Sequence, residues 1–225
     1  MTKNWQFPIV GIGASAGGLK ALEGLLPGIP ADTGMAFVIV THLPPGRESL
    51  MPEILRRSTT MPVAEVKDGV ALEPDHLYVS PPDRVVKVAD GKLQLVVPAP
   101  EMHRFPIDQF LISLAEYAGE GAIAILLSGG GSDGTLGVRA IKDHGGLTFA
   151  QGSDGGSGPM QSGMPDTAIA SGKVDILFWP QHPWVNRPLR HAPSTPDTGK
   201  LTVIGLVMLA STMVIYGTAR KYVSG

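Results

Sequence analysis

The chain has 225 residues, of which 43% are hydrophobic and 17% are charged, and its formal net charge is −2. This composition predicts a packed globular core, and the near-neutral charge argues against a nucleic-acid-binding protein. Because the chain has no cysteine, disulfides, thiolate nucleophiles and cysteine-based metal sites are excluded. The first residues lack the apolar run of a signal peptide, so we expect a cytoplasmic protein.

The first predicted strand, an apolar run over residues 9–14, leads into a glycine-rich turn with a single serine, Ser15. A helix follows, and its leucines share one face: Leu19, Leu22, Leu25 and Leu26. Such a turn can hold a phosphate at a helix N-terminus. It can also present a serine nucleophile beside backbone N–H groups that bind an oxyanion. The turn alone leaves both alternatives open.

The second predicted strand covers residues 35–40 and ends in Thr41 and His42. Residues 47–57 are predicted as a helix with an apolar face formed by Leu50, Ile54 and Leu55. Short strands are predicted at 62–66 and 77–79. Two β-rich runs then flank Asp90-Gly91, which is a strong hairpin signal. We expect this antiparallel hairpin at the edge of an otherwise parallel sheet.

Strands and helices alternate again in the following part of the chain. Successive elements are predicted as a helix at 106–117 with Phe110, Leu111 and Leu114 inward, a strand at 122–127, a helix ending near 142, a strand at 147–150, a glycine- and serine-rich loop at 152–163, a short helix from 164 and a strand at 174–178. Repeated strand–helix units predict a doubly wound, mostly parallel, Rossmann-like α/β sheet within a domain of residues 1–180.

The C-terminal part changes in composition. Residues 181–200 are rich in Pro, His and Arg and are predicted as a linker. Residues 201–217 carry no charge, and a membrane span needs about 20 residues, so 201–219 are predicted as a membrane-anchoring helix followed by a short basic tail, 220–225. The alternative is a further helix or strand pair of the globular core.

Three strand ends carry residues with catalytic chemistry. Ser15 follows the first strand, His42 follows the second, and Asp133 lies in the turn after the strand ending at Leu127. Ligands of open α/β sheets gather at the carboxyl ends of strands. Serine, histidine and aspartate together are the components of an acyl-transfer triad. Each residue taken singly has a structural alternative, since serine and aspartate commonly cap helices.

A dinucleotide site is the competing interpretation of the first turn. The spacing Gly11-x-Gly13-x-x-x-Gly17 is a relaxed version of the nucleotide fingerprint, which is weak when it stands alone. That fingerprint requires an acidic residue at the end of the second strand. Thr41 and His42 stand there, and no Gly-Lys-Ser or Gly-Lys-Thr follows the turn, so a P-loop is also disfavoured.

Three motifs resemble the signature turns of the CheB-type protein-glutamate methylesterases. They are VGIGASAGG at 10–18, HLP at 42–44 and LSGGGSDG at 127–134. Two weaker stretches, RFPID at 104–108 and GMP at 163–165, are similar to the family in order and spacing. The resemblance covers roughly residues 7–180 and therefore the whole catalytic domain of that family.

The resemblance implies hydrolysis of glutamyl methyl esters on chemoreceptors with release of methanol, and deamidation of receptor glutamines, without a cofactor or a metal. Carried over by position, Ser15 is the nucleophile, His42 the general base and Asp133 the residue that orients it. The backbone N–H groups of Ala16 and Gly130 are candidates for the oxyanion hole. The residues expected to line the substrate cleft are His103, Arg104 and Met164.

The chain departs from the family pattern at two site positions. Ala16 replaces a threonine, and Gly130 replaces a methionine common in the third turn. The chain also starts almost at the first catalytic strand, so we expect no phosphorylation control in cis and a regulatory or methyltransferase partner in trans. These departures keep a second hypothesis open, a sensory or docking module of the same fold with little turnover.

Overall fold

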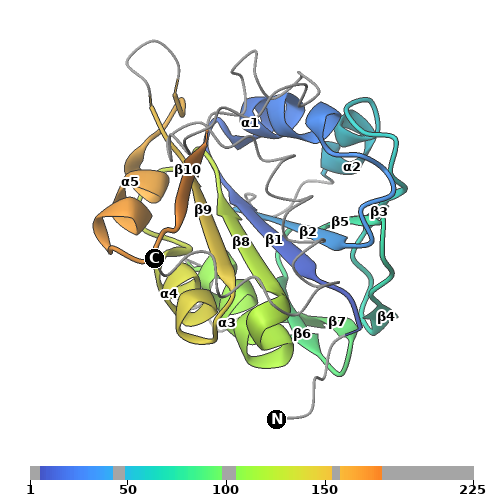
Figure 1. Ribbon diagram of the computed structural model, residues 1–225. Coiled ribbons are helices and arrows are strands. Elements are labelled where there is room, and N and C mark those ends of the chain that lie inside the picture. The colour runs from blue at the N-terminus through green and yellow to red at the C-terminus, as the bar shows by residue number, and fades with distance from the viewer. Residues whose placement is uncertain (1–5, 43–48, 98–104, 154–157, 179–225) are drawn as a thin grey trace, which may run out of the picture.

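The computed structural model describes residues 6–42, 49–97, 105–153 and 158–178, and the following account is confined to them (Figure 1). At its centre lies a seven-stranded sheet in the order β10-β9-β8-β1-β2-β5-β3. Every pairing in this sheet is parallel. Its strands are β1 (Ile9–Ala14), β2 (Ala36–Thr41), β3 (Val63–Glu65), β5 (Leu77–Val79), β8 (Ala122–Leu126), β9 (Leu147–Gln151) and β10 (Ile176–Phe178).

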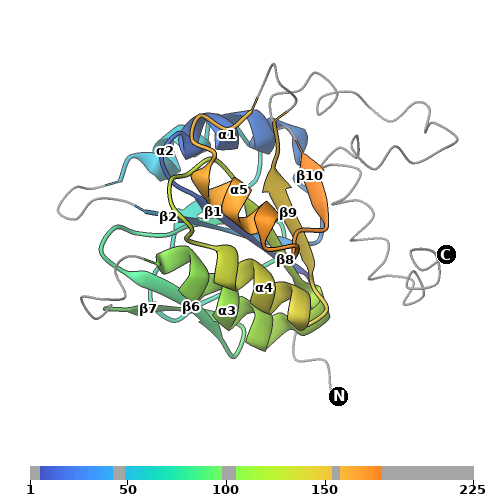
Figure 2. The same ribbon diagram turned by 90° about the vertical axis from the view of Figure 1, so that its left-hand side faces the viewer.

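Helices cover both faces of the sheet, which confirms the predicted doubly wound fold (Figure 2). The helices are α1 (Gly18–Leu25), α2 (Met51–Leu55), α3 (Pro106–Ala118), α4 (Thr135–Asp143) and α5 (Gly163–Ala170), with short 3-10 turns η1 (Leu26–Gly28) and η3 (Gly119–Gly121). Residues of α1 and α2 share one buried cluster with β1, and residues of α3 and α4 share the other with the opposite side of the sheet.

Strand β1 is buried along its whole length because both of its faces are covered. Val10 and Ile12 belong to the cluster beneath α1. On the other face, glycines let α3 lie directly against the strand. A Cβ added at Gly13 would lie 2.5 Å from Ile107 Cγ2, and one at Gly11 would lie 2.7 Å from Leu111 Cδ2. The glycines of β1 therefore set the position of α3, which begins beside the candidate site.

The predicted hairpin is present, but it belongs to a sheet of its own. Strands β6 (Val85–Ala89) and β7 (Lys92–Val96) are joined by Asp90 and Gly91, whose φ angles of 50° and 73° suit the tight hairpin turn. They pair with β4 (Val70–Ala71) in a three-stranded antiparallel sheet. The apolar face of β6 packs against α3, where the Val88 N–H donates to Ser113 Oγ at 3.0 Å, so the hairpin does not extend the parallel sheet.

The helix predicted at 47–57 is wrong in its extent and in one of its core residues. Its described part, α2, covers only Met51–Leu55, and residues 43–48 lie outside the description. Leu55 is buried as expected, whereas Leu50 is 68% exposed. Leu50 precedes the first helical turn, so the helical period that would turn its side chain inward does not apply to it.

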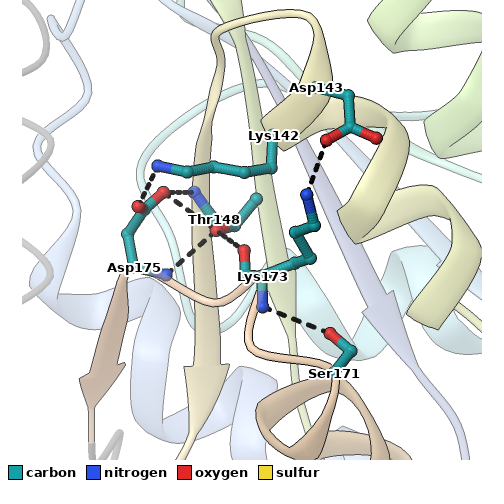
Figure 3. Close-up of polar contacts among 6 residues, drawn as sticks. All are labelled: Lys142, Asp143, Thr148, Ser171, Lys173 and Asp175. Carbon is teal, nitrogen blue, oxygen red and sulfur yellow. Dashed lines mark hydrogen bonds and ion pairs between the residues drawn. The ribbon is translucent and has the colours of Figure 1, made fainter.

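A cluster of polar side chains stabilises the sheet at the amino ends of β9 and β10 (Figure 3). The Thr148 hydroxyl on β9 lies within hydrogen-bond distance of two acceptors, Asp175 at 2.9 Å and the Lys173 carbonyl at 2.7 Å, and the Thr148 N–H donates to Asp175. Lys142 pairs with Asp175, and Lys173 pairs with Asp143. The cluster ties the end of α4 and the start of β10 to β9, on the side of the sheet opposite the strand ends that carry the predicted triad.

No helix in the described ranges is long and apolar enough to cross a membrane. The predicted linker at 181–200, the anchoring helix at 201–219 and the tail at 220–225 lie outside those ranges.

Candidate active site

The site lies where the order of the strands reverses. From β1 the chain moves outward through β2 to β3 and β5, and it then returns to the other side of β1 as β8. Crevices at the carboxyl ends of such strands are the usual ligand sites of open α/β sheets. The turns after β1 and β8 lie at this edge of the sheet, where Ser15 meets the turn at 128–134.

Ser15 and His42 follow adjacent parallel strands at the same level. Ala14 pairs with Thr41 in the ladder between β1 and β2, and each candidate residue comes directly after its strand. Neighbouring strands lie about 4.8 Å apart. Ser15 is half-buried and His42 is exposed. Within the described ranges no hydrogen bond joins the His42 ring to Ser15 or to Asp133, and catalytic hydrogen bonds are often looser before a substrate binds.

Ser15 contacts the third turn directly. Its N–H donates to the Ser128 carbonyl at 2.9 Å, which extends the β1–β8 ladder past the strand ends. A Cβ added at Gly129 would lie 3.0 Å from Ser15 Cβ and 2.8 Å from Met164 Sδ. Only a glycine at 129 therefore lets the serine, the third turn and the buried Met164 of α5 come together. Met164, a predicted cleft residue, therefore packs behind Gly129 and is fully buried.

Asp133 is buried, and α3 holds its carboxylate. The Ile107 and Asp108 N–H groups donate to its two oxygens at 3.1 Å and 2.9 Å. Burial raises the pKa of Asp133 to about 6, although these two hydrogen bonds oppose the shift. The neighbouring carboxylate of Asp108, which was not predicted as a site residue, accepts the Gly137 N–H at 2.8 Å. Burial also raises the pKa of Asp108.

These two aspartates cap each other's helices. Asp133 precedes α4 and caps α3, while Asp108 lies in the first turn of α3 and caps α4. Neither helix has a capping side chain from its own N-cap residue. In the sequence, Asp108 appears only as an acidic residue in the first turn of a helix. Such residues are common, and their presence does not indicate that the side chain caps a second helix.

Two backbone N–H groups at the site are held in fixed directions. The Ser15 carbonyl accepts the Gly18 N–H at 2.8 Å, and the Gly129 carbonyl accepts the Met164 N–H at 2.9 Å. In a trans peptide the C=O and N–H point in opposite directions. The N–H groups of Ala16 and Gly130 therefore point away from these bonds, and no hydrogen bond within the described part of the chain uses either of them. Both residues are exposed.

Two predicted cleft residues, His103 and Arg104, lie outside the described residues. The placed site residues are therefore Ser15, Ala16, His42, Gly130, Asp133 and Met164.

Residues 10–182 match the family model described as CheB methylesterase. The chain belongs to the CheB methylesterase family. It is 35% identical over 175 residues to a protein-glutamate methylesterase/protein-glutamine glutaminase of Photorhabdus laumondii, covering 76% of this chain and 49% of that protein. It is 36% identical to a second such protein from Pseudomonas aeruginosa, with the same coverage. The chain thus spans about half the length of these relatives.

The fold agrees with a solved member of the family. The crystal structure of the Thermotoga maritima CheB methylesterase catalytic domain matches with a TM-score of 0.71 at 28% identity. The match covers 79% of this chain and 95% of that domain. This CheB-family chain therefore shares nearly all of the fold of that catalytic domain.

Proposed function

We propose that this CheB-family chain is a serine hydrolase that removes methyl esters from glutamyl side chains of chemoreceptor-type proteins, releases methanol, and deamidates glutamine as a related activity. The names of its relatives support the reaction. The observation that carries the proposal is the contact of Ser15 with the third turn, whose Ser128 carbonyl accepts the Ser15 N–H at the switch in strand order. The N–H groups of Ala16 and Gly130, one in each of these two turns, make no hydrogen bond within the described residues.

In the proposed reaction the Ser15 hydroxyl attacks the carbonyl carbon of the ester while His42 accepts its proton. The negative charge that develops on the carbonyl oxygen is stabilised by the Ala16 and Gly130 N–H groups. His42 then returns the proton to the methoxide, which leaves as methanol. Water, activated by the same imidazole, hydrolyses the acyl-enzyme and regenerates Ser15 and the glutamate.

Asp133 would orient His42 and stabilise the imidazolium. The N–H groups of Ile107 and Asp108 fix its carboxylate, and each oxygen keeps a second lone pair for the histidine. With a pKa of about 6 the carboxylate is mostly ionised at neutral pH. An imidazolium that forms beside it would favour this ionised state further.

The test is methanol release from a methyl-labelled chemoreceptor. Replacing Ser15 by alanine should lower the rate by about 10³-fold or more, since a triad nucleophile cannot be substituted by its neighbours. Ser171→Ala is the matched control, because it removes a hydroxyl that bonds the Ala168 carbonyl and the Lys173 N–H at the end of α5. Its rate should equal that of the wild type.

An equally slow release by the wild type and Ser15→Ala would overturn the hydrolase proposal. That result would favour the second candidate, a docking module of the same fold. Gly130 supports this candidate, because a glycine leaves this position of the third turn without a side chain.

We also propose that residues 201–219 anchor the catalytic domain to a membrane. The uncharged run between Lys200 and Arg220 supports this proposal.

A further inference from the structure

Ser128 is a fully buried polar residue at the end of β8, with 0% of its surface exposed. Its backbone N–H donates to Gln151 Oε1 at 2.9 Å. Its hydroxyl donates to the Ala16 carbonyl at 2.8 Å and accepts the Gln161 N–H at 2.9 Å. Its carbonyl accepts the Ser15 N–H. Every polar group of this residue is therefore used, and two of its bonds reach the turn that carries the nucleophile.

These two bonds lie on either side of one peptide unit. The Ser15 N–H belongs to the peptide before Ser15, and the Ala16 carbonyl belongs to the peptide after Ala16. Between them lies the Ser15–Ala16 peptide, whose carbonyl accepts the Gly18 N–H. Three consecutive peptide units are thus held, and the middle one carries the Ala16 N–H.

We infer that Ser128 is a positioning residue for the proposed hydrolase: its hydroxyl and carbonyl fix the turn of Ser15 so that the Ala16 N–H points at the developing oxyanion. This inference rests on the proposed function. Ser128 does not touch the substrate in this scheme. It acts through the backbone of Ser15 and Ala16.

The packing around the turn leaves little room for another arrangement. Gly17 adopts a φ of 77°, and a Cβ at this position would lie 2.7 Å from Ser128 Oγ and 2.6 Å from Met160 Cβ. The first turn therefore lies directly on the Ser128 hydroxyl. Without that hydroxyl, the Ala16 carbonyl would lose its donor and the Gln161 N–H would lose its acceptor.

Gln151 extends the arrangement to a third strand. It is the last residue of β9 and is buried, and its side-chain oxygen accepts the Ser128 N–H. The chain of contacts thus runs from β9 through β8 to the turn after β1. Because Gln151 is one contact further from Ser15 than Ser128 is, substitutions of Gln151 should lower kcat as substitutions of Ser128 do, but by a smaller factor.

The test compares kcat and KM for methanol release by the full chain. Ser128→Ala should lower kcat by about 10- to 100-fold, because misalignment of one oxyanion donor weakens transition-state stabilisation without removing it. KM should stay within about twofold, since the substrate ester is bound by other groups. A fluorophosphonate probe that labels Ser15 should react more slowly by a similar factor.

Ser113→Ala is the matched control. The Ser113 hydroxyl also accepts one backbone N–H, from Val88, and donates to one carbonyl, from Phe110, but it lies between α3 and β6. Both variants lose one bond from a backbone N–H and one bond to a backbone carbonyl, so they should lose similar stability. Only Ser128→Ala should lower kcat. An equal loss of kcat in both variants would assign the effect to destabilisation and overturn the inference.

The remaining outcomes separate the two proposals. A wild-type kcat in Ser128→Ala, with Ser15→Ala inactive, would overturn the role of Ser128 and leave the hydrolase intact. A wild-type rate equal to that of Ser15→Ala would overturn both. If Ser128→Ala does not fold, Gln151→Met removes only the acceptor of the Ser128 N–H, and it should lower kcat severalfold. A wild-type kcat in Gln151→Met would then contradict the inference.

Discussion

At the scale of single residues, Asp133 is both a candidate catalytic residue and the cap of helix α3. Its carboxylate is buried and is held by two N–H groups at the start of α3. Its pKa of about 6 lies above the ordinary value because desolvation outweighs these bonds. A raised pKa means that the folded protein binds this proton more tightly than the unfolded chain does, so the residue links stability to pH.

We predict that Asp133→Asn changes the pH dependence of folding. Between about pH 4 and about pH 6 the wild-type carboxyl is protonated when folded and ionised when unfolded, so its contribution to stability falls as the pH rises. The wild type should therefore lose up to about 3 kcal/mol of unfolding free energy relative to Asp133→Asn across this range. Urea unfolding at a series of pH values measures the difference.

Asp143→Asn provides a control of opposite sign. The ion pair with Lys173 lowers the pKa of Asp143, so its contribution is present at neutral pH and is lost as the pH falls. A difference between the wild type and Asp133→Asn that does not vary with pH would contradict the prediction.

Some of the candidate site residues can be predicted from the sequence, and others cannot, for physical reasons. Ser15, His42 and Asp133 became candidates because each follows an apolar strand, and local patterns predict where such strands end. Ser128 and Asp108 could not be found in this way. The Ser128 hydroxyl bonds Ala16, which is 112 residues away along the chain, and no local pattern encodes that distance.

At the scale of elements, the approach of α3 to β1 depends on the absence of side chains. The glycines at 11 and 13 of β1 face Leu111 and Ile107 of the helix. The same helix supplies the N–H groups that hold Asp133. The distance between the strand and the helix therefore determines where a candidate catalytic carboxylate lies.

We predict that Gly13→Ala destabilises the protein by about 1–3 kcal/mol, because the new Cβ would overlap Ile107 and Leu126 in a packed core. Gly130→Ala is the matched control, since a Cβ there meets nothing within 4 Å. Its stability should change by less than about 0.5 kcal/mol. Thermal unfolding of both variants checks the prediction, and equal melting temperatures would show that the helix can move away freely.

The hairpin and α2 show where local patterns end. Asp90-Gly91 predicted the turn correctly, because both residues adopt the positive φ that this turn requires. The pattern could not say which sheet the strands would join, since that depends on the apolar surface of α3. The exposure of Leu50 has a similar origin: an apolar residue at helical spacing faces the core only if the helix reaches it.

At the scale of the whole molecule, the candidate catalytic residues and the polar cluster around Thr148 lie at opposite ends of the strands of one sheet. The candidate residues follow the carboxyl ends of β1, β2 and β8. The cluster of Thr148, Asp175 and their lysine partners lies at the amino end of β9 and beside β10 (Figure 3). Contacts that hold the outer strands thus make no use of groups that the proposed reaction needs.

The proposed anchor is tested on the full chain expressed in bacteria. The full chain should sediment with membranes, and a truncation after Thr198 should remain in the supernatant. Leu209→Lys is the matched control of equal length, because a lysine in the middle of a span costs about 2.5–3.5 kcal/mol on insertion scales. A full chain that stays in the supernatant would contradict the proposal.

The open space beside Gly130 means that this position can accept many different side chains. The neighbouring Ser128 is fully hydrogen-bonded, and a Cβ at Gly129 would strike Met164 and Ser15, so substitutions at either position would disturb Ser15, the proposed nucleophile. Position 130 has neither a positive φ nor a neighbour that a new side chain would strike. A saturation library at this codon would therefore sample side chains of every size in the third turn while the fold is kept, which makes position 130 the starting point for changing the ester preference of the proposed hydrolase.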